Sequence, residues 1–541
     1  MPRCSGADRP VLSPAPVRVA GSGMVCAIDH LAAGAGIEIL RHGGSAVDAA
    51  VAASAVLAVT SQHMCGMGGD LWAVVHPRRG ESPVALNASG RAGSGADPAR
   101  LRARGLEWMP DGEVAAVTVP GCVDGWLALH DRFGRLALAD VLEAARRYAE
   151  DGFPASPGLA SATEAVAHLD DAVDYRVAGG LKTGAMIRRP GVARSLSAVA
   201  AGGRDAFYRG EFGERLVELG GGEFSEADLA RSQADWVRAI SADAWGRRLW
   251  TAPPNSQGYL TVSAAWIADE FDLQDPDDPR WAHLLVEAAR HAAQDRLEVL
   301  HEGADGAELL APERLAPRRA AIDPATASTL PVPGAHGDTI AVCAVDSERQ
   351  GVSLLQSNAG GWGSGLIVPG VRIFLHNRGL GFSLQAGHPA EYGPGRRPPH
   401  TLSPTIVTGS DRELGVVLGT MGADSQPQIL LQLLARLICA GQSPGDVMHA
   451  GRFALAPPPD STGSTTDDGF STWRSRGNVL VRLEPNAPSG WFDGLRARGH
   501  AVTRDDADPG RFGHAQLIDV RGEVLWGATD PRALAGAAAG W

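Results

Sequence analysis

The stretch Gly337-Asp-Thr-Ile-Ala-Val-Cys-Ala-Val345, followed by Gly351-Val-Ser-Leu-Leu-Gln-Ser357, decides the fold of this 541-residue chain. Both segments are apolar runs bounded by turn residues, a pattern that predicts two buried strands. From about residue 303 to residue 338 the character differs, and Asp323–Asp338 is rich in Pro, Ala, Ser and Thr. Such a segment cannot bury enough apolar surface to fold on its own. We therefore expect a mobile linker that ends where a rigid strand begins, at Thr339.

This junction is suited to one kind of nucleophile. A threonine hydroxyl is a poor nucleophile and needs an adjacent base. If the chain is cut between Asp338 and Thr339, the new α-amine, with a pKa near 8, can take the hydroxyl proton. Taken alone, the Gly-Asp-Thr sequence also fits an ordinary turn followed by a capping residue.

Helices and strands are expected along the whole chain. Apolar residues at helical spacing predict helices at 32–40, 46–59, 139–150, 205–219, 225–232, 281–300, 428–439 and 489–498. Further strands are predicted at 71–75, within 236–252, and at 371–376, 402–408, 413–419, 478–483 and 515–526. Residues 456–472 are expected to form a surface loop. Strands with helices on both sides predict an α/β (α+β) protein with stacked sheets covered by helices.

Composition excludes some classes of function. The 62 acidic residues outnumber the 49 basic ones, and a net charge of -13 disfavours general binding of nucleic acid. We find no apolar stretch of signal-peptide or membrane-span length, and we expect a soluble, cytoplasmic protein without membrane association. The six cysteines are far apart and are expected to be buried thiols: Cys4, Cys26, Cys65, Cys122, Cys343 and Cys439.

Several ordered segments resemble the gamma-glutamyltransferases (gamma-glutamyltranspeptidases or glutathione hydrolases). The similar stretches are Gly23–Val25, Ile37 to Asp48 and beyond, Thr118–Trp126, Gly337–Asp346, Val352–Gly365 and Gly527–Arg532. The resemblance extends from about residue 20 to residue 541. It implies the four-layer αββα sandwich of N-terminal nucleophile hydrolases, in an acylase-like branch. It also implies an intertwined large subunit, 1–338, with a loose start over about 1–20, and a small subunit, 339–541.

The resemblance assigns roles to individual positions. Thr339 occupies the place of the nucleophile for both self-cleavage and catalysis, and Ser357 that of a hydroxyl residue bonded to it. Gly422 and Ala423 occupy the positions whose backbone N–H groups form the oxyanion hole, where little side-chain bulk is tolerated. Arg91 occupies the place of an arginine that grips a substrate carboxylate, a partner that a guanidinium binds in a bidentate manner.

The acyl-binding positions depart from the family pattern. The family places an aspartate just before a Phe-Ser pair to hold the substrate ammonium, but here Leu380 and Gly381 precede Phe382-Ser383. His400 and Thr401 replace a serine pair, and Arg378 replaces a neutral amide. With Arg91, Arg378 and His400 we expect a positively charged site that suits an acyl group with a carboxylate and no ammonium.

Three functions remain open. The first is a gamma-glutamyl hydrolase or transferase acting on glutathione-like amides. The second is an acylase or amidase for dicarboxylic monoamides of the glutaryl or oxalyl type. The third is a non-catalytic relative that is never processed. For the enzyme we expect no metal or organic cofactor, a small-molecule amide substrate and two subunits from one precursor, with a dimer of such heterodimers as an option.

Three other signals favour structure over chemistry. His283, Glu287 and His291 share one helix face at spacings that a metal could bridge, but such a face is more commonly solvated. The loop Gly66-Met-Gly-Gly69 lacks the Lys-Ser/Thr of a phosphate-binding loop and is interpreted as a tight turn. His400 and Ser403 do not predict a serine triad, because the chain has no G-x-S-x-G elbow.

Overall fold

Two antiparallel sheets form the centre of the molecule. The computed structural model describes residues 16–330, 338–456, 479–505 and 509–541. Within them, the first sheet has the order β21 (Ala537–Gly540), β2 (Met24–Ala27), β10 (Asp338–Val345), β11 (Gly351–Ala359), β3 (Asp70–His76), β4 (Val84–Ala88) and β7 (Asp235–Arg238). The second has the order β1 (Arg18–Ala20), β20 (Val524–Thr529), β19 (Gln516–Arg521), β15 (Leu414–Gly419), β14 (Thr405–Thr408), β9 (Arg247–Thr251) and β8 (Ile240–Ala244).

The central strands are apolar throughout because both of their faces are buried. In β10, Ala341 and Cys343 belong to the apolar layer between the two sheets, whereas Ile340 and Val342 pack toward the helices. Successive side chains of a strand point to opposite faces, so a strand buried on both sides has no polar positions. This explains the unbroken apolar run after Thr339.

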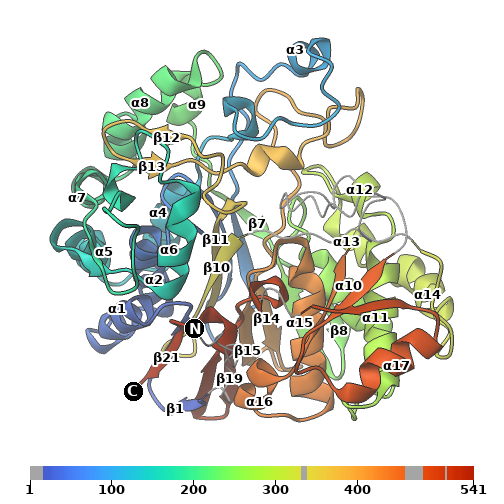
Figure 1. Cartoon of the computed structure of the whole chain (residues 1–541). Coiled ribbons are helices and arrows are strands. Elements are labelled where there is room, and N and C mark those ends of the chain that lie inside the picture. The colour runs from blue at the N-terminus through green and yellow to red at the C-terminus, as the bar shows by residue number, and fades with distance from the viewer. Residues whose placement is uncertain (1–15, 331–337, 457–478, 506–508) are drawn as a thin grey trace, which may run out of the picture.

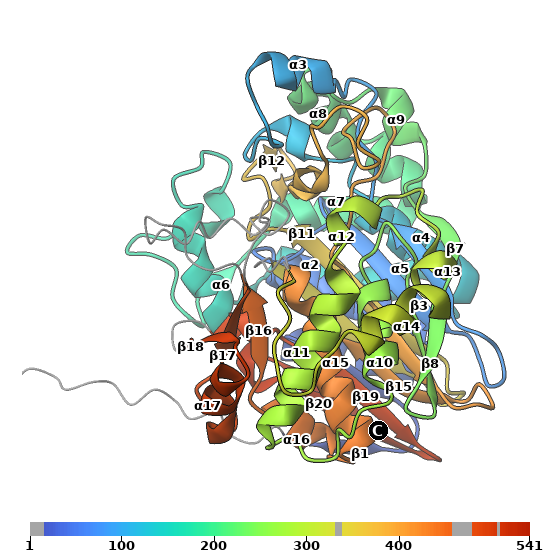
Figure 2. The same ribbon diagram turned by 90° about the vertical axis from the view of Figure 1, so that its right-hand side faces the viewer.

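Helices cover the outer face of each sheet (Figure 1). On the side of the first sheet, α1 (His30–Arg41), α2 (Ala46–Thr60) and α4 (Cys122–Phe133) contact the strands, and α5 (Leu138–Asp151) and α7 (Pro190–Tyr208) pack on these helices. On the side of the second sheet lie α10 (Tyr259–Ala268), α11 (Pro279–Ala293), α15 (Gln426–Leu434) and α16 (Pro444–His449), and α17 (Ser489–Ala497) packs on α11. The expected four-layer αββα sandwich is confirmed, and Figure 2 looks onto the helical layer of the second sheet, with α10 and α11 in front of the strands.

Residues before and after position 338 interleave in both sheets. Strands β10 and β11 lie between β2 and β3, and β14 pairs with β9. A cut between Asp338 and Thr339 would therefore leave the two parts joined along several strand pairs.

Parts of the predicted linker and of the predicted loose start form regular structure. Residues 303–330 are ordered: α13 (Gly306–Leu309) and α14 (Pro312–Ala320) bury Leu309 and Leu315 in the core of the second helical layer. A few leucines thus anchor a segment that is otherwise rich in small residues. At the other end, Arg18–Ala20 forms β1. The rest of both predictions, residues 1–15 and 331–337, lies outside the described residues, as does 457–472 of the predicted surface loop.

Three predicted elements are divided. The helix expected over 281–300 is α11 followed by the separate α12 (Arg296–Val299), and the strand expected over 515–526 is the hairpin of β19 and β20. The helix expected over 205–219 is also interrupted, between the end of α7 and α8 (Glu211–Gly220).

The described cysteines are buried or half-buried thiols. Of the described cysteines, four are buried and Cys439 is half-buried, and all are free thiols; Cys4 lies outside the described residues. No helix in the described part of the chain has the length and apolarity needed to cross a membrane.

Candidate functional site

Thr339 meets Ser357 at a local irregularity of the first sheet. Asp338 pairs with Ala359 and Ile340 pairs with Gln356, so the single residue Thr339 lies opposite two residues of β11. Its hydroxyl donates to Ser357 Oγ at 3.1 Å, and Ser357 Oγ also accepts the Ala359 N–H at 2.8 Å. Thr339 is only 1% exposed in the uncut chain. The structure thus brings the two predicted residues into contact on a rigid strand.

Asp70 lies on the other side of Ser357. It is the first residue of β3 and is the cross-strand partner of Ser357. The preceding loop packs tightly, since a Cβ on Gly69 would lie 2.3 Å from the Ser357 carbonyl oxygen. The predicted tight turn therefore permits a close approach to β11, and Asp70 follows it directly. Sequence reasoning missed Asp70.

Asp70 forms a buried ion pair with Arg378. Arg378 Nε donates to Asp70 Oδ2 at 2.7 Å, and neither side chain is more than 1% exposed. Burial alone would raise the pKa of Asp70, but the charge of Arg378 and the contact with His400 hold it well below its usual value. His376 Nδ1 lies 3.4 Å from the same carboxylate oxygen. We call Arg378 and Asp70 the closed pair.

His400 is neutral in this environment. Its Nδ1 accepts the Leu402 N–H at 3.2 Å, so Nε2 carries the proton that it donates to Asp70 Oδ2 at 2.8 Å. Burial, followed by the neighbouring Arg378, lowers the pKa of His400 to about 4. The prediction that Arg378 and His400 make this part of the site positive is therefore wrong, because Asp70 compensates the arginine and the imidazole is uncharged.

The remaining acyl-binding positions adjoin the closed pair. Arg378 Nη1 donates to Thr401 Oγ1 at 3.1 Å. Gly381 ends the same short helical turn, Arg378–Gly381, and a Cβ there would lie 2.8 Å from the Pro399 carbonyl oxygen. Arg378, Gly381, His400 and Thr401 are thus gathered on two adjacent segments.

Arg91 belongs to a second cluster, which we call the open triad. Arg91 Nη2 and Arg397 Nη1 each donate to Asp235 Oδ2 at 2.7 Å. The two arginine side chains are 11% and 6% exposed, whereas that of Asp235 is 47% exposed. Burial and the neighbouring Arg91 lower the pKa of Arg397 to about 10, which still leaves it charged at neutral pH. Arg91 Nη1 is buried and has no hydrogen-bond partner among the described residues.

The sequence carried a signal for this second cluster. Arg397 precedes His400 by three residues, in Arg396-Arg397-Pro-Pro-His400, and Asn255 Nδ2 holds the Pro398 carbonyl at 2.6 Å. The basic pair beside a substrate-binding segment could have marked Arg397. Nothing local pointed to Asp235, which is far away in the sequence.

The predicted oxyanion positions follow strand β15. Gly419, at the end of β15, faces β10, since a Cβ there would lie 3.1 Å from Ala341 Cβ. The next turn therefore reaches the Thr339 end of the sandwich. Gly422 and Ala423 have positive φ angles of 129° and 43°. In the described part of the chain, neither N–H donates a hydrogen bond, so both donors are available to a ligand.

The polar face of α11 has a structural use. His283 Nδ1 lies 2.8 Å from His500 Nε2, and Glu287 forms an ion pair with Arg290 at 2.7 Å. Glu287 also accepts the Ser328 N–H at 3.0 Å, and His291 Nε2 lies 3.0 Å from Ser328 Oγ. These contacts tie the segment upstream of residue 331 to the helix. Over the described residues, no group of three or more His, Cys, Asp or Glu side chains is arranged to hold a metal.

Ser403 and His400 do not form a catalytic pair. Ser403 Oγ donates to the Thr401 carbonyl at 3.2 Å, while His400 Nε2 donates to Asp70. The hydroxyl and the imidazole thus serve different partners.

The chain is similar to known proteins over nearly its whole length. A family model described as gamma-glutamyltranspeptidase matches residues 32–541. An oxamate amidohydrolase proenzyme of Klebsiella pneumoniae is 35% identical, over 97% of this chain and 99% of the relative. A glutathione hydrolase-like proenzyme of Bacillus subtilis is 33% identical, over 94% and 97%. The crystal structure of cephalosporin acylase from Bacillus halodurans has a TM-score of 0.88 at 32% identity, and the match covers 100% of this chain and 99% of that one.

Proposed function

The chain belongs to the gamma-glutamyltranspeptidase family, and from this premise we propose that it is a self-processing amide hydrolase whose nucleophile is Thr339. The observation that carries the proposal is the hydrogen bond from Thr339 Oγ1 to Ser357 Oγ, at the start of the buried strand β10. A fixed hydroxyl directly after the proposed cleavage point is what an N-terminal nucleophile requires.

Maturation and catalysis use the same oxygen. In maturation, Thr339 Oγ attacks the Asp338 carbonyl carbon, the peptide C–N bond breaks, and the Thr339 nitrogen takes up the hydroxyl proton. Water then hydrolyses the ester, which leaves an Asp338 carboxylate and a free Thr339 amine. In catalysis this amine accepts the hydroxyl proton while Oγ attacks the substrate amide. The N–H groups of Gly422 and Ala423 stabilise the oxyanion, and the Thr339 ammonium passes the proton to the substrate nitrogen as the substrate C–N bond breaks. The substrate amine then leaves, and water or an acceptor amine resolves the acyl-enzyme.

The charges of the site favour an acyl group with a carboxylate and no ammonium. The open triad combines two guanidinium groups with one carboxylate, so it retains positive charge for a substrate carboxylate. The closed pair has no such surplus, and Asp70 already accepts from Arg378 and His400. A substrate ammonium would therefore find no free carboxylate at the closed pair. We propose dicarboxylic monoamides, of the glutaryl or oxalyl type, as substrates, in line with the relative named oxamate amidohydrolase.

A gamma-glutamyl substrate of the glutathione type is the second candidate. It is favoured by the relative named as glutathione hydrolase-like, which is 33% identical. In that case Asp70 would have to exchange part of its contact with Arg378 for the substrate ammonium. The proposal also takes the working protein to be two chains of one precursor that act in the cytoplasm on small-molecule amides.

Anilides of the two acyl groups distinguish the candidates. Glutaryl and gamma-glutamyl anilides differ only by the α-ammonium, and we expect faster hydrolysis of the glutaryl compound under identical conditions. The Thr339→Ala variant serves as the blank and should release no aniline from either. If the gamma-glutamyl anilide is turned over a hundred-fold better, the assignment from charge is wrong, although the nucleophile is not.

A further inference from the structure

The side-chain amide of Gln257 joins two segments of the candidate site. Gln257 is fully buried just before α10, and its Nε2 donates to the Thr401 carbonyl and to the Ala423 carbonyl, both at 2.9 Å. Its backbone N–H also donates to the His400 carbonyl at 2.8 Å. One amide thus connects the acyl-binding segment with the turn that carries the oxyanion donors.

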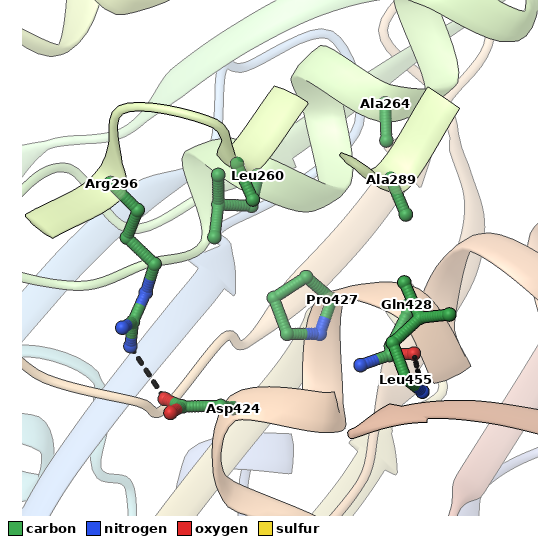
Figure 3. A pocket seen from close by; sticks show the side chains of 9 residues that line it. Leu260, Ala264, Ala289, Arg296, Asp424, Pro427, Gln428 and Leu455 are labelled. Atoms are coloured by element: carbon green, nitrogen blue, oxygen red, sulfur yellow. Dashed lines mark hydrogen bonds and ion pairs between the residues drawn. The ribbon is translucent and has the colours of Figure 1, made fainter. Parts of the chain in front are cut away.

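Arg296 fixes the orientation of that amide. Its Nε and Nη2 donate to Gln257 Oε1 at 3.1 and 2.7 Å, so Gln257 must present Nε2 to the two carbonyls. Nη2 also donates to Asp424 Oδ1 at 2.5 Å, and Figure 3 shows Arg296 directed at this carboxylate from the start of α12. Arg296 and Asp424 are both buried, and Asp424 directly follows Ala423.

The turn needs such support. Ala423 has a left-handed φ of 43°, a conformation that a residue with a Cβ adopts only when its surroundings impose it. Behind the turn is a small cavity of about 30 Å³, lined by Asp424 and Pro427 together with apolar residues of α10 and α11. Figure 3 shows this space between Pro427 and the alanines. On the side of this cavity, the hydrogen bonds from Gln257 and Arg296 hold the turn.

We propose that Arg296 and Gln257 are positioning residues, which hold the N–H groups of Gly422 and Ala423 in the direction of the oxyanion. This inference rests on the proposed function, in which those two groups stabilise the tetrahedral intermediate. Oxyanion donors are effective only when they are oriented before the reaction begins. A displaced turn should therefore weaken the transition state and leave substrate binding almost unchanged.

The test compares Arg296→Met with a matched control. Arg314→Met removes a neighbouring arginine that pairs with Asp295 at 2.6 Å and, among the described residues, forms no hydrogen bond or ion pair with Gln257 or Asp424. Rates are expressed per chain that begins at Thr339, counted by mass spectrometry, so incomplete maturation does not distort them. We expect Arg296→Met to lower kcat about 10- to 100-fold, part of the effect of deleting an oxyanion donor, with KM within about three-fold. The control should retain the wild-type kcat.

A conservative variant covers the case in which Arg296→Met does not fold or mature. Arg296→Lys keeps one charged donor for Gln257 Oε1 or Asp424, and should show an intermediate kcat with an unchanged KM. A wild-type kcat in either Arg296 variant, or a loss confined to KM, would overturn the inference. An uncut or inactive wild-type protein would instead overturn the proposed function.

Discussion

The closed pair and the open triad are both arginine–carboxylate clusters, yet they differ in the net charge and the exposed surface that they present to a substrate. In the closed pair, Arg378 and Asp70 are one-to-one and almost wholly buried. In the open triad, Arg91 and Arg397 share Asp235, which is 47% exposed. The two clusters are linked through the short segment from Arg397 to His400, which contacts Asp70.

The difference shows why counting basic residues in the sequence overestimates the charge of a site. A buried guanidinium that has its own carboxylate contributes almost no net charge, whereas two guanidiniums on one carboxylate leave one positive charge. We therefore assign structural support to the closed pair and recognition of the substrate carboxylate to the open triad.

Asp70→Asn should have the largest effect on stability. It leaves Arg378 buried without a compensating charge, and breaking a buried pair costs about 3–5 kcal/mol of the free energy of unfolding. Urea denaturation in the uncut Thr339→Ala background would measure this loss on a single chain. Asp235→Asn is the comparison, with a smaller expected loss because Asp235 is 47% exposed and Arg397 keeps its hydrogen bonds to the Gln233 and Asn87 carbonyls. Equal losses in the two variants would remove the distinction between the clusters.

Arg91→Met should weaken recognition of a carboxylate-bearing acyl group. A lost charge-assisted hydrogen bond is worth about 1.5–3 kcal/mol, which corresponds to a decrease of about 10- to 100-fold in kcat/KM, mainly through KM. Kinetics with a glutaryl anilide and an uncharged acyl anilide would separate the loss of carboxylate binding from a general loss of activity. Arg100→Met, which removes a half-exposed arginine paired with Glu223, is the control. A similar loss on the uncharged substrate would mean that Arg91 does not bind the carboxylate.

His400, which contacts the closed pair, predicts how the free energy of unfolding depends on pH. The pKa of His400 is about 4 in the folded chain, below its ordinary value of 6.5, so the unfolded chain binds more protons in between. The contribution of the neutral His400 to the free energy of unfolding is complete above about pH 6.5 and is lost as the pH falls toward 4. Asp70 has a pKa well below its usual value and keeps its charge in this window. His400→Gln, which cannot titrate, should flatten this part of a plot of unfolding free energy against pH; an unchanged slope would show that folding does not lower the pKa of His400.

Asp235→Asn should have the smallest effect, and in the favourable direction. Removing the exposed carboxylate raises the positive charge of the open triad, so KM for a glutaryl anilide should fall about two- to five-fold at low salt. The gain should fade at high ionic strength, where the charge is screened. A higher KM would indicate that Asp235 is needed to hold the two arginines in place.

Sequence reasoning predicted the family, the fold and the meeting of Thr339 with Ser357, because each depends on local patterns. The apolar runs after Thr339 and Gly351 define two central strands, and neighbouring strands bring their ends together. The linker was overestimated because Leu309 and Leu315 supply anchors that composition alone does not reveal.

The site was predicted less completely because its charges are set by distant partners. Asp70 and Arg378 are 308 residues apart in the sequence, and Arg91 and Asp235 are 144 apart. Gln257 and Arg296 carry no motif at all, and only the folded chain brings them to Ala423 and Asp424. The sequence identifies the residue type at each position of the site, but the net charge of each cluster depends on partners that only the fold brings together.

Intact mass and N-terminal sequencing of the purified protein test the central claim, that Thr339 is a nucleophile exposed by self-cleavage. The 541-residue chain of 56.3 kDa should appear as two fragments of about 35 and about 21 kDa, in proportion to their lengths. The smaller fragment should begin Thr-Ile-Ala-Val-Cys, and Thr339→Ala should remain one inactive chain. An uncut wild-type chain that hydrolyses amides, or a small fragment that begins at any other residue, would contradict the account.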